Sequence, residues 1–362
     1  MSIKRQISSV IEIGKRVITR ESSPYFIADI GANHNGDLQR AKELIYLAAE
    51  AGADAAKFQH FKADTIVSKV GFEALNGQSS HQAKWKKSVY EVYQDASIST
   101  DWTAELVATC QDAGVDFFTS PYSLDLVDYI DQYVSCYKVG SGDITWLEII
   151  EYMAKKNKPM LLACGASSMD EVVAAVDAVL LHQGQLAIMQ CNTNYTASIE
   201  NFKYINLNVL KTLGAMYPDA ILGLSDHTPG HATVLGAIAL GANVIEKHFT
   251  DNNDLEGPDH KFAMNPSAWR TMVDVSQELH LALGNGIKKV EDNERETVVL
   301  QRRSIRLKHS LKQGHTIAAQ DVEFLRPCPK DALAPYEVNL VIGKKLNQAL
   351  PAGAHIKWNY LK

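Results

Sequence analysis

The chain has little of the positive charge that marks proteins binding nucleic acid. Its 362 residues include 36 Lys and Arg against 42 Asp and Glu, which gives a formal net charge of −6. Basic residues are dense only at Arg302, Arg303 and Arg306. Proteins that bind the phosphate backbone are typically basic, with Lys and Arg gathered on one face. The composition therefore argues against a nucleic-acid partner.

Long apolar runs are also missing. No window of the sequence approaches the roughly 18 uninterrupted apolar residues of a membrane-spanning helix. The N-terminal stretch MSIKRQISSVIEIGKRV lacks the apolar core of a secretory signal peptide. We therefore expect a cytoplasmic protein without a membrane partner.

Cysteine is sparse, and its pattern excludes a disulfide framework. The five cysteines are odd in number, scattered, and without the spacing of metal ligands. We expect reduced thiols at Cys110, Cys136, Cys164, Cys191 and Cys328.

The sequence does contain a repeated alternation of short β-rich runs and amphipathic segments. A chain of this length with 46% apolar residues can bury one core of roughly 250 residues and a small second domain. Eight alternating units predict an α/β fold, a (β/α)8 TIM barrel with its active site where the strands end. A doubly wound sheet is the alternative, which the even units and the lack of a GxGxxG turn disfavour. The runs are 26–30, 55–61, 115–120, 136–140, 159–163, 186–191, 221–225 and 244–248.

The stretch from Gly223 to Thr250, GLSDHTPGHATVLGAIALGANVIEKHFT, has the spacing of two neighbouring strands joined by a helix. His227 follows the first strand and His248 ends the second, so we expect both imidazoles at the carboxyl ends of adjacent parallel strands. Two neutral imidazoles with positions left open for water or substrate suit a catalytic divalent transition metal. The alternative is that each histidine only caps its strand with a hydrogen bond.

Other strand ends are expected to deliver polar groups to the same mouth. Lys57 and Lys138 stand in apolar strands, where an unpaired lysine is costly. We expect a multiply charged anion between them, held also by hydroxyl groups. The alternative is that the lysines form structural salt bridges with Asp29, Glu246 or Asp226. The candidate residues around the lysines are Asp29, Gln59, Ser120, Ser141, Tyr195, Ser225 and Glu246.

Two connections are expected to shape this mouth. The connection from Phe72 to Ala96 is longer than the others, and long loops on the catalytic side of a barrel usually control access. A peripheral helix is the alternative. The acidic, turn-rich residues 251–261 follow the eighth strand and include Asp259, which we expect to contact substrate. A helix from Pro266 to Leu283 then closes the barrel.

Composition also predicts the domain boundaries. We expect the barrel in residues 1–285, a charged linker or exposed helix in 286–300, and a small β-rich domain in 301–362. A domain of about 60 residues has a marginal core. We therefore expect it to pack on a barrel, either its own or a partner's.

A set of motifs in chain order resembles the sialic acid synthase family, that is, N-acetylneuraminate synthase and relatives that make legionaminate and pseudaminate. The motifs are IADIGANHNGD, GADAAKFQHFKADTIV, YKVGSGD, SDHTPGH, VIEKHFT with EGPDH, and RRS with LRP. Such enzymes have a TIM barrel followed by an antifreeze-like (SAF) domain, which caps the partner's barrel in a domain-swapped homodimer. The resemblance implies condensation of phosphoenolpyruvate with an N-acylated hexosamine to give a nine-carbon 2-keto sugar acid and phosphate, with a divalent cation such as manganese as cofactor.

The resemblance also implies a role for each candidate residue. His227 and His248 match the metal ligands. Lys57, Lys138, Ser120, Ser141 and Ser225 match the phosphoenolpyruvate contacts. Gln59, Tyr195, Glu246, Asp259 and Arg326 match the sugar side.

Proton handling is expected from a carboxylate, Glu246 or Asp29. We favour Glu246, because it shares a strand face with His248. Several positions depart from the family pattern; among them, Asp29 stands where the family has a glutamate, and Ala163-Cys164-Gly165 replaces a serine-containing motif near the phosphate. These departures affect the expected sugar more than the expected reaction.

Two other functions fit part of the pattern. A metal-dependent hydrolase on the same barrel would usually carry an HxH pair on its first strand, where this chain has Asn33-His34-Asn35. A non-catalytic carbohydrate- or ice-binding protein built on the C-terminal domain would leave the inward lysines and histidines unexplained.

Overall fold

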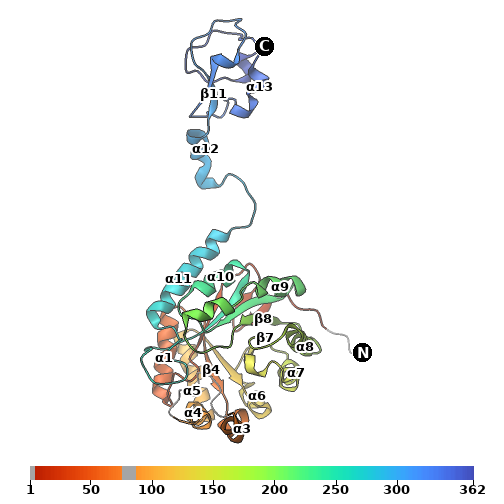
Figure 1. Ribbon diagram of the computed structural model, residues 1–362, viewed down its shortest axis with the longest axis vertical. Helices are drawn as coiled ribbons and strands as arrows, with labels where there is room; N and C mark the ends of the chain where they lie inside the picture. The colour runs from red at the N-terminus through yellow and green to blue at the C-terminus, as the bar shows by residue number, and fades with distance from the viewer. Residues whose placement is uncertain (1–4, 76–86) are drawn as a thin grey trace. The chain divides into compact units, whose positions relative to one another are not determined.

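The computed structural model describes residues 5–75 and 87–362. It contains two compact units, Met1–Gly284 and Asn285–Lys362. The first unit is a parallel sheet surrounded by helices (Figure 1), and the second is a small unit with an antiparallel pair of strands.

Eight parallel strands form the sheet of the first unit. Their hydrogen-bonded order is β5-β4-β3-β10-β9-β8-β7-β6, and β5 also contacts β6, so the sheet curves round into a barrel. This confirms the predicted (β/α)8 class. The strands are β3 (Tyr25–Asp29), β4 (Ala55–His60), β5 (Asp116–Pro121), β6 (Tyr137–Val139), β7 (Met160–Ala163), β8 (Leu186–Cys191), β9 (Ile221–Asp226) and β10 (Ala242–His248).

Amphipathic helices cover the outside of the sheet, because each has one apolar stripe that must be buried. Their ends follow local sequence signals: Ser168 and Glu171 form a capping box at the start of α8, and Gly114 ends α5 in the left-handed conformation. The covering helices are α1 (Leu38–Glu50), α5 (Thr103–Ala113), α6 (Leu124–Ile130), α7 (Leu147–Lys155), α8 (Met169–Leu180), α9 (Val209–Met216), α10 (Ala232–Ala239) and α11 (Pro266–Leu283).

A turn separates β9 from the helix that follows it. Strand β9 ends at Asp226, and α10 begins at Ala232. The side chain of Asp226 accepts hydrogen bonds from the backbone N–H and the hydroxyl of Thr228. These bonds hold a turn in place of the first helical turn, as short polar side chains often do.

The long connection after β4 contains short helices in its described part. These are α2 (Ala63–Ile66), α3 (Lys69–Ala74) and α4 (Val89–Ala96), the last beginning with a capping box formed by Ser88 and Glu91. Residues 76–86 of this connection lie outside the described residues. Its predicted role in substrate access stays a prediction.

An N-terminal hairpin fills the barrel from the end opposite the mouth. Strands β1 (Ile11–Ile13) and β2 (Arg16–Ile18) pair antiparallel, and they were not expected from the sequence. Their buried side chains join the inward apolar residues of the barrel strands in one core cluster. This cluster consists of Ile11, Ile13, Ile18, Tyr25, Ile27, Ala55, Phe118, Cys136, Leu161, Ala187, Met189, Ile221 and Val244.

The second unit has a core of its own. Strands β11 (Ser304–Leu307) and β12 (Val322–Leu325) pair antiparallel, and the short helix α13 (Val338–Val341) contributes Val341 to the core. Helix α12 (Arg295–Gln301) occupies much of the segment expected to be a linker or exposed helix. The apolar core is built from Ile305, Leu307, Leu311, Ile317, Val322, Leu333, Val341, Leu346, Leu350 and Ile356.

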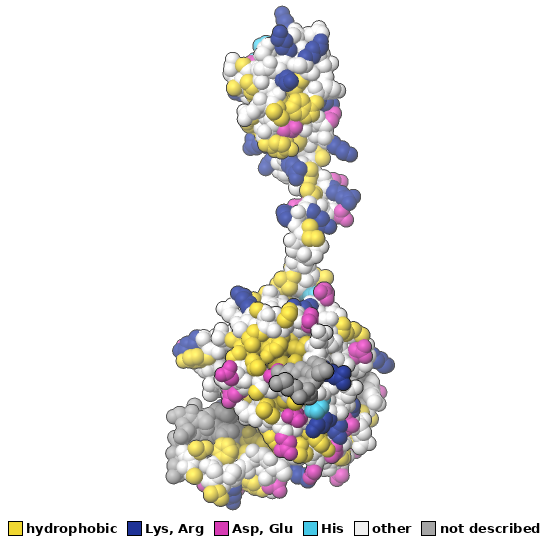
Figure 2. Space-filling view, turned by 90° about the vertical axis from the view of Figure 1, so that its right-hand side faces the viewer, with side chains coloured by type: hydrophobic (Ala, Val, Ile, Leu, Met, Phe, Trp, Pro, Cys, Tyr) yellow, Lys and Arg dark blue, Asp and Glu magenta, His cyan; other side chains and the backbone are white. Residues whose placement is uncertain are grey.

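The surface agrees with the charge balance of the sequence. Figure 2 shows acidic and basic side chains interspersed over the visible face of the first unit, without a continuous basic patch. None of the helices in the described part of the chain is both long and apolar enough to cross a membrane.

The hairpin's packing predicts a stability effect. Ile13→Ala should lower the free energy of unfolding by about 2–5 kcal/mol, because it leaves a cavity under the barrel. Ile13 is fully buried, whereas Val17 on the same hairpin is 55% exposed. Val17→Ala is therefore the control, and it should change the free energy of unfolding by no more than about 0.5 kcal/mol. Urea denaturation followed by circular dichroism measures the stability of both variants. Equal effects would contradict the packing of the β1–β2 hairpin inside the barrel.

Candidate active site

Polar side chains replace apolar ones inside the barrel as several of the strands approach their carboxyl ends. Strand residues alternate between the two faces, so a residue two positions after an inward apolar residue also points inward. We define the mouth of the barrel as the carboxyl ends of its eight strands. The apolar residues that pack against the β1–β2 hairpin are followed, two positions later, by polar groups at this mouth. The pairs are Ile27 and Asp29, Ala55 and Lys57, Phe118 and Ser120, Cys136 and Lys138, and Val244 and Glu246.

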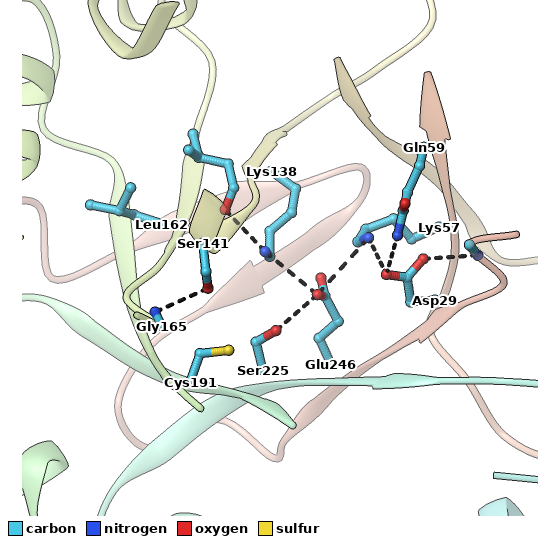
Figure 3. Close-up of polar contacts among 12 residues, drawn as sticks. Asp29, Lys57, Gln59, Lys138, Ser141, Leu162, Gly165, Cys191, Ser225 and Glu246 are labelled. Atoms are coloured by element: carbon cyan, nitrogen blue, oxygen red, sulfur yellow. Dashed lines mark hydrogen bonds and ion pairs between the residues drawn. The ribbon is translucent and has the colours of Figure 1, made fainter. Parts of the chain in front are cut away.

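Glu246 is the centre of the polar cluster (Figure 3). Its Oε1 accepts a hydrogen bond from the Ser225 hydroxyl at 3.1 Å. The same oxygen lies 3.5 Å from Nζ of Lys138 and 3.9 Å from Nζ of Lys57. Two ammonium groups, from the strands β4 and β6 on either side of β5, thus converge on one carboxylate oxygen.

Asp29 forms the second anionic group of the cluster. Its Oδ2 accepts hydrogen bonds from Lys57 at 2.5 Å and from Gln59 at 3.2 Å, and its Oδ1 accepts one from the backbone N–H of Gly31 at 3.0 Å. Burial lowers the pKa of Lys57, but the charges of Asp29 and Glu246 and the hydrogen bond to Asp29 raise it by more. Lys57 is therefore protonated at neutral pH.

The sequence left open that Lys57 and Lys138 form salt bridges with Asp29, Glu246 or Asp226. The structure shows two of these three carboxylates as their partners. Lys57 and Lys138 pair with Asp29 and Glu246, whereas Asp226 pairs with Lys247 on the other side of the sheet. Asp226 points outward because it follows the inward Ser225 along β9. A structural ion pair does not exclude a ligand role, since each lysine retains further N–H donors.

Among the described residues, three buried polar atoms at the mouth have no hydrogen-bond partner. They are Oγ of Ser120, Oε2 of Glu246 and Nδ1 of His248. Leaving a buried polar atom unpaired costs about 1–3 kcal/mol, and most such atoms in folded proteins are paired. Their convergence at the mouth is typical of a site that binds a polar ligand.

The two histidines lie side by side, as their spacing predicts. Their ring centroids are 5.4 Å apart, and Tyr195 contacts His227 at a centroid distance of 4.4 Å. Nδ1 of His227 lies 3.1 Å from the backbone oxygen of Asn192, which suits a protonated Nδ1 and makes Nε2 the candidate metal ligand. Phe262 packs against His248 at 4.9 Å.

The protonation state of His248 suits a metal ligand. Burial lowers its pKa to about 3, although the charge of Asp259 opposes this shift. His248 is therefore neutral at physiological pH, and neutral imidazole is the form that binds metals. No group of three or more His, Cys, Asp or Glu side chains arranged to hold a metal occurs in residues 5–75 and 87–362. A metal on the two histidines would thus take its other ligands from water or substrate, as catalytic sites do.

Asp259 is held against His248 by the loop after β3. Its Oδ2 accepts a hydrogen bond from the backbone N–H of Ala32 at 3.2 Å and lies 3.7 Å from Nδ1 of His248. Gly31 has a φ of +50°, and a Cβ there would come within 2.8 Å of the Asp259 carboxylate. Glycine is thus required for the close approach of these two loops.

The remaining predicted residues lie in two places. Ser141 follows β6, and its hydroxyl accepts a hydrogen bond from the backbone N–H of Gly165 at 3.0 Å. Arg326 belongs to the second unit, where it is exposed and donates from Nε to the backbone oxygen of Gln301 at 2.6 Å. Its contribution to a barrel mouth stays a prediction.

Cys191 was expected only as a reduced thiol, but it ends β8 at the mouth. Burial raises the pKa of its thiol. The neighbouring His227, Ser141 and Lys138 lower that pKa by a larger amount, so the net shift is downward. The signal was available in the sequence, because Cys191 is two residues after the inward Met189.

Asp143 is a second residue that the sequence interpretation did not select. Burial raises the pKa of its carboxyl to about 6, and the nearby Lys138 opposes the shift. Its charge also raises the pKa values of Tyr122 and Tyr93, to which burial contributes most. Its place two residues after Ser141 in the YKVGSGD motif was the available signal.

Comparisons with known proteins identify the family of the chain. Residues 44–288 match the NeuB family and residues 302–362 match the SAF domain. The chain is 35% identical over 344 residues to the N,N'-diacetyllegionaminic acid synthase of Legionella pneumophila, an alignment that covers 93% of this chain and 94% of the relative. It is 30% identical over 323 residues to the human N-acetylneuraminate-9-phosphate synthase, with 89% and 88% covered.

A solved structure gives the same result in three dimensions. The N-acetylneuraminic acid (sialic acid) synthetase of Leptospira borgpetersenii serovar Hardjo-bovis, in complex with citrate, matches with a TM-score of 0.69 at 26% identity. The match covers 81% of this chain and 96% of that one. The chain therefore belongs to the NeuB family, with a SAF domain at its C-terminal end.

Proposed function

We propose that this enzyme condenses phosphoenolpyruvate with an N-acylated hexosamine and releases phosphate and a nine-carbon 2-keto sugar acid. The observation that carries the proposal is the approach of Lys57 and Lys138 to one oxygen of Glu246, beside two histidines on adjacent strands. Membership of the NeuB family and relatives named as synthases of legionaminic and pseudaminic acids support it.

The lysines and nearby hydroxyl groups are suited to hold phosphoenolpyruvate. Lys57 and Lys138 supply positive charge, and Ser120, Ser141 and Ser225 supply hydroxyl donors for phosphate and carboxylate oxygens. The unpaired Ser120 hydroxyl is available for such a bond without loss of an existing one. Held in this way, C3 of the enol phosphate is oriented toward the sugar carbonyl.

Charge balance favours binding a cation together with the anion. The two ammonium groups of Lys57 and Lys138 are offset by the carboxylates of Asp29 and Glu246. A multiply charged anion would leave the cluster negative, whereas a divalent cation on His227 and His248 restores the balance. We propose manganese as the cation, and when bound it supplies a Lewis acid for the sugar's aldehyde oxygen.

The carboxylates of the chain handle protons in this proposal. Attack of C3 on the sugar carbonyl forms the carbon–carbon bond, water then adds at C2, and phosphate departs. Water addition releases a proton, and the new alkoxide oxygen takes one up. Glu246 is placed for this transfer because its Oε2 has no partner. Asp29 is the alternative, although its oxygens already accept three hydrogen bonds.

The sugar side is proposed to lie near Gln59, Tyr195, Asp259 and the exposed Arg326. N-acetylmannosamine and 2,4-diacetamido relatives are the candidate acceptors, and a relative named for a diacetylated product supports testing the latter first. We place the reaction in the cytoplasm.

The hydrolase alternative lacks its expected histidine pair. His34 is buried and accepts a hydrogen bond from the backbone N–H of Gly36 through Nδ1. It packs edge-on against Trp102 instead of facing His227 and His248.

The proposal is tested by offering the enzyme phosphoenolpyruvate with a panel of N-acyl hexosamines and 2,4-diacetamido sugars, and by measuring phosphate release. Release should require both substrates and should stop when a chelator removes the metal. His248→Ala should abolish release while the fold is kept, and His182→Ala, a half-buried histidine beside Glu151, is the matched control. Release from phosphoenolpyruvate alone, or activity unaffected by chelation, would contradict the proposal.

Lys138 provides a test of substrate assignment. Lys138→Met should weaken phosphoenolpyruvate binding by about 2–5 kcal/mol, because it removes one partner of a buried charge group, while sugar binding changes less. Isothermal titration with each substrate measures the two affinities. Lys156→Met, at a surface lysine paired with Asp128, should change neither. Equal losses for both substrates would make Lys138 a structural residue.

We also propose a domain-swapped homodimer in which the second unit of one subunit completes the mouth of the other. Arg326 is exposed, and its guanidinium is suited to bind an acyl or hydroxyl group of the sugar. Closure of the mouth by a neighbouring subunit would exclude water from the reaction.

Mixed dimers test the swap. When Arg326→Ala subunits are mixed with His248→Ala subunits, the Arg326→Ala barrel should receive an intact arginine from its partner, which completes one site in each heterodimer. Part of the activity should then return, as measured by phosphate release. Heterodimers that form but stay as inactive as their parents would reject the exchange.

A further inference from the structure

A buried ion pair lies on the outer face of β9 and β10, behind the two histidines. Asp226 and Lys247 are partners in the parallel register of these strands, and both side chains are 1% exposed. Because strand residues alternate between faces, this pair points into the layer between sheet and helices. The next residue in each case is a histidine of the mouth, His227 or His248.

Charge is unusual in this layer of the molecule. The residues that the other strands direct toward the helices are mainly apolar and belong to the main core cluster, among them Phe58, Phe117, Tyr137, Leu162, Ile188, Leu224 and Ile245. Replacing a buried ion pair by well-packed apolar side chains is often neutral or stabilising. Packing alone therefore gives no reason for a lysine and an aspartate here, and their hydrogen bonds are the informative feature.

Those hydrogen bonds converge on the residue after His227. Nζ of Lys247 donates to Asp226 and, at 2.6 Å, to the backbone oxygen of Thr228. Asp226 accepts from the backbone N–H of Thr228 at 3.3 Å and from its hydroxyl at 2.7 Å. Asp226 also accepts from the Thr233 hydroxyl of α10 at 2.7 Å. The backbone on both sides of His227 is thereby fixed to the strand that carries His248.

We propose that Asp226 and Lys247 are positioning residues that hold His227 and His248 at the separation and orientation a divalent metal requires. The inference rests on the proposed function, because that function places the metal on these histidines. Neither residue touches metal or substrate in this arrangement. Contacts behind metal ligands orient them, and the loss of such contacts typically weakens metal binding by about 10- to 100-fold.

The double variant Asp226→Val with Lys247→Met tests the proposal without leaving an unpaired buried charge. Its dissociation constant for Mn²⁺, measured by electron paramagnetic resonance of the free ion, should rise about 10- to 100-fold. Phosphoenolpyruvate binding measured without metal, and the melting temperature, should not fall. Leu224→Met with Ile245→Leu changes neighbouring outward residues of the same strands at similar volume, and this control should bind Mn²⁺ like the wild type.

A second variant covers the case in which the double variant fails to fold. Thr228→Val keeps the ion pair and the size of the side chain but removes one hydroxyl bond to Asp226. It should weaken Mn²⁺ binding in the same direction by a smaller factor. Wild-type Mn²⁺ affinity in a folded double variant, or in Thr228→Val when the double variant does not fold, would overturn the positioning role.

His248→Ala separates this inference from the function on which it rests. If the wild type binds Mn²⁺ and His248→Ala does not, the assignment of the metal to the histidines is supported. The variants of Asp226, Lys247 and Thr228 then test only the positioning role. If the wild type and His248→Ala bind Mn²⁺ equally, the histidines are not the metal site, and both the proposed metal role and this inference are overturned.

Discussion

The approach of two buried ammonium groups to a single carboxylate oxygen is the interaction on which the rest of the barrel depends. Lys57 and Lys138 are almost fully buried, yet they lie within 3.9 Å of the same Glu246 oxygen. Removing one member of such a group leaves an uncompensated charge and typically costs about 3–5 kcal/mol. The cluster is therefore stable only if the strands that carry its members are held in fixed register.

The two layers around the cluster provide that rigidity. Below it, the β1–β2 hairpin and the inward apolar residues form a packed core that keeps water from the base of the charged groups. Outside it, the helices cover the sheet mainly with apolar side chains, and Asp226 and Lys247 form their ion pair in this layer. The same two-residue alternation of the strands produces the core, the site and the contacts behind the site.

The charge states of the two histidines are set by different neighbours. Burial lowers the pKa of His248 to about 3. Burial also lowers the pKa of His227, but its contacts with Cys191, the charge of Asp226 and the bond to Asn192 raise it by more. The two neighbouring imidazoles therefore differ in charge preference, because burial dominates at His248 and polar contacts dominate at His227.

The sequence by itself determined the barrel class and much of the site. Alternation within each run is a local property, so it was sufficient to place Lys57, Lys138 and Glu246 inside the barrel. The spacing of His227 and His248 likewise follows from one strand–helix–strand unit. Helix α11 has the bounds, Pro266 to Leu283, that the sequence predicted.

Only the tertiary structure decided which of these groups are partners. Three-residue strands carry too little pattern to reveal the β1–β2 hairpin. Asp226 was considered as a partner of the inward lysines, but it pairs outward with Lys247 because the next strand brings that lysine beside it. The physical reason is that sequence spacing fixes the face on which a residue lies, whereas an ion pair depends on the register between strands. That register is set by the closing of the whole barrel.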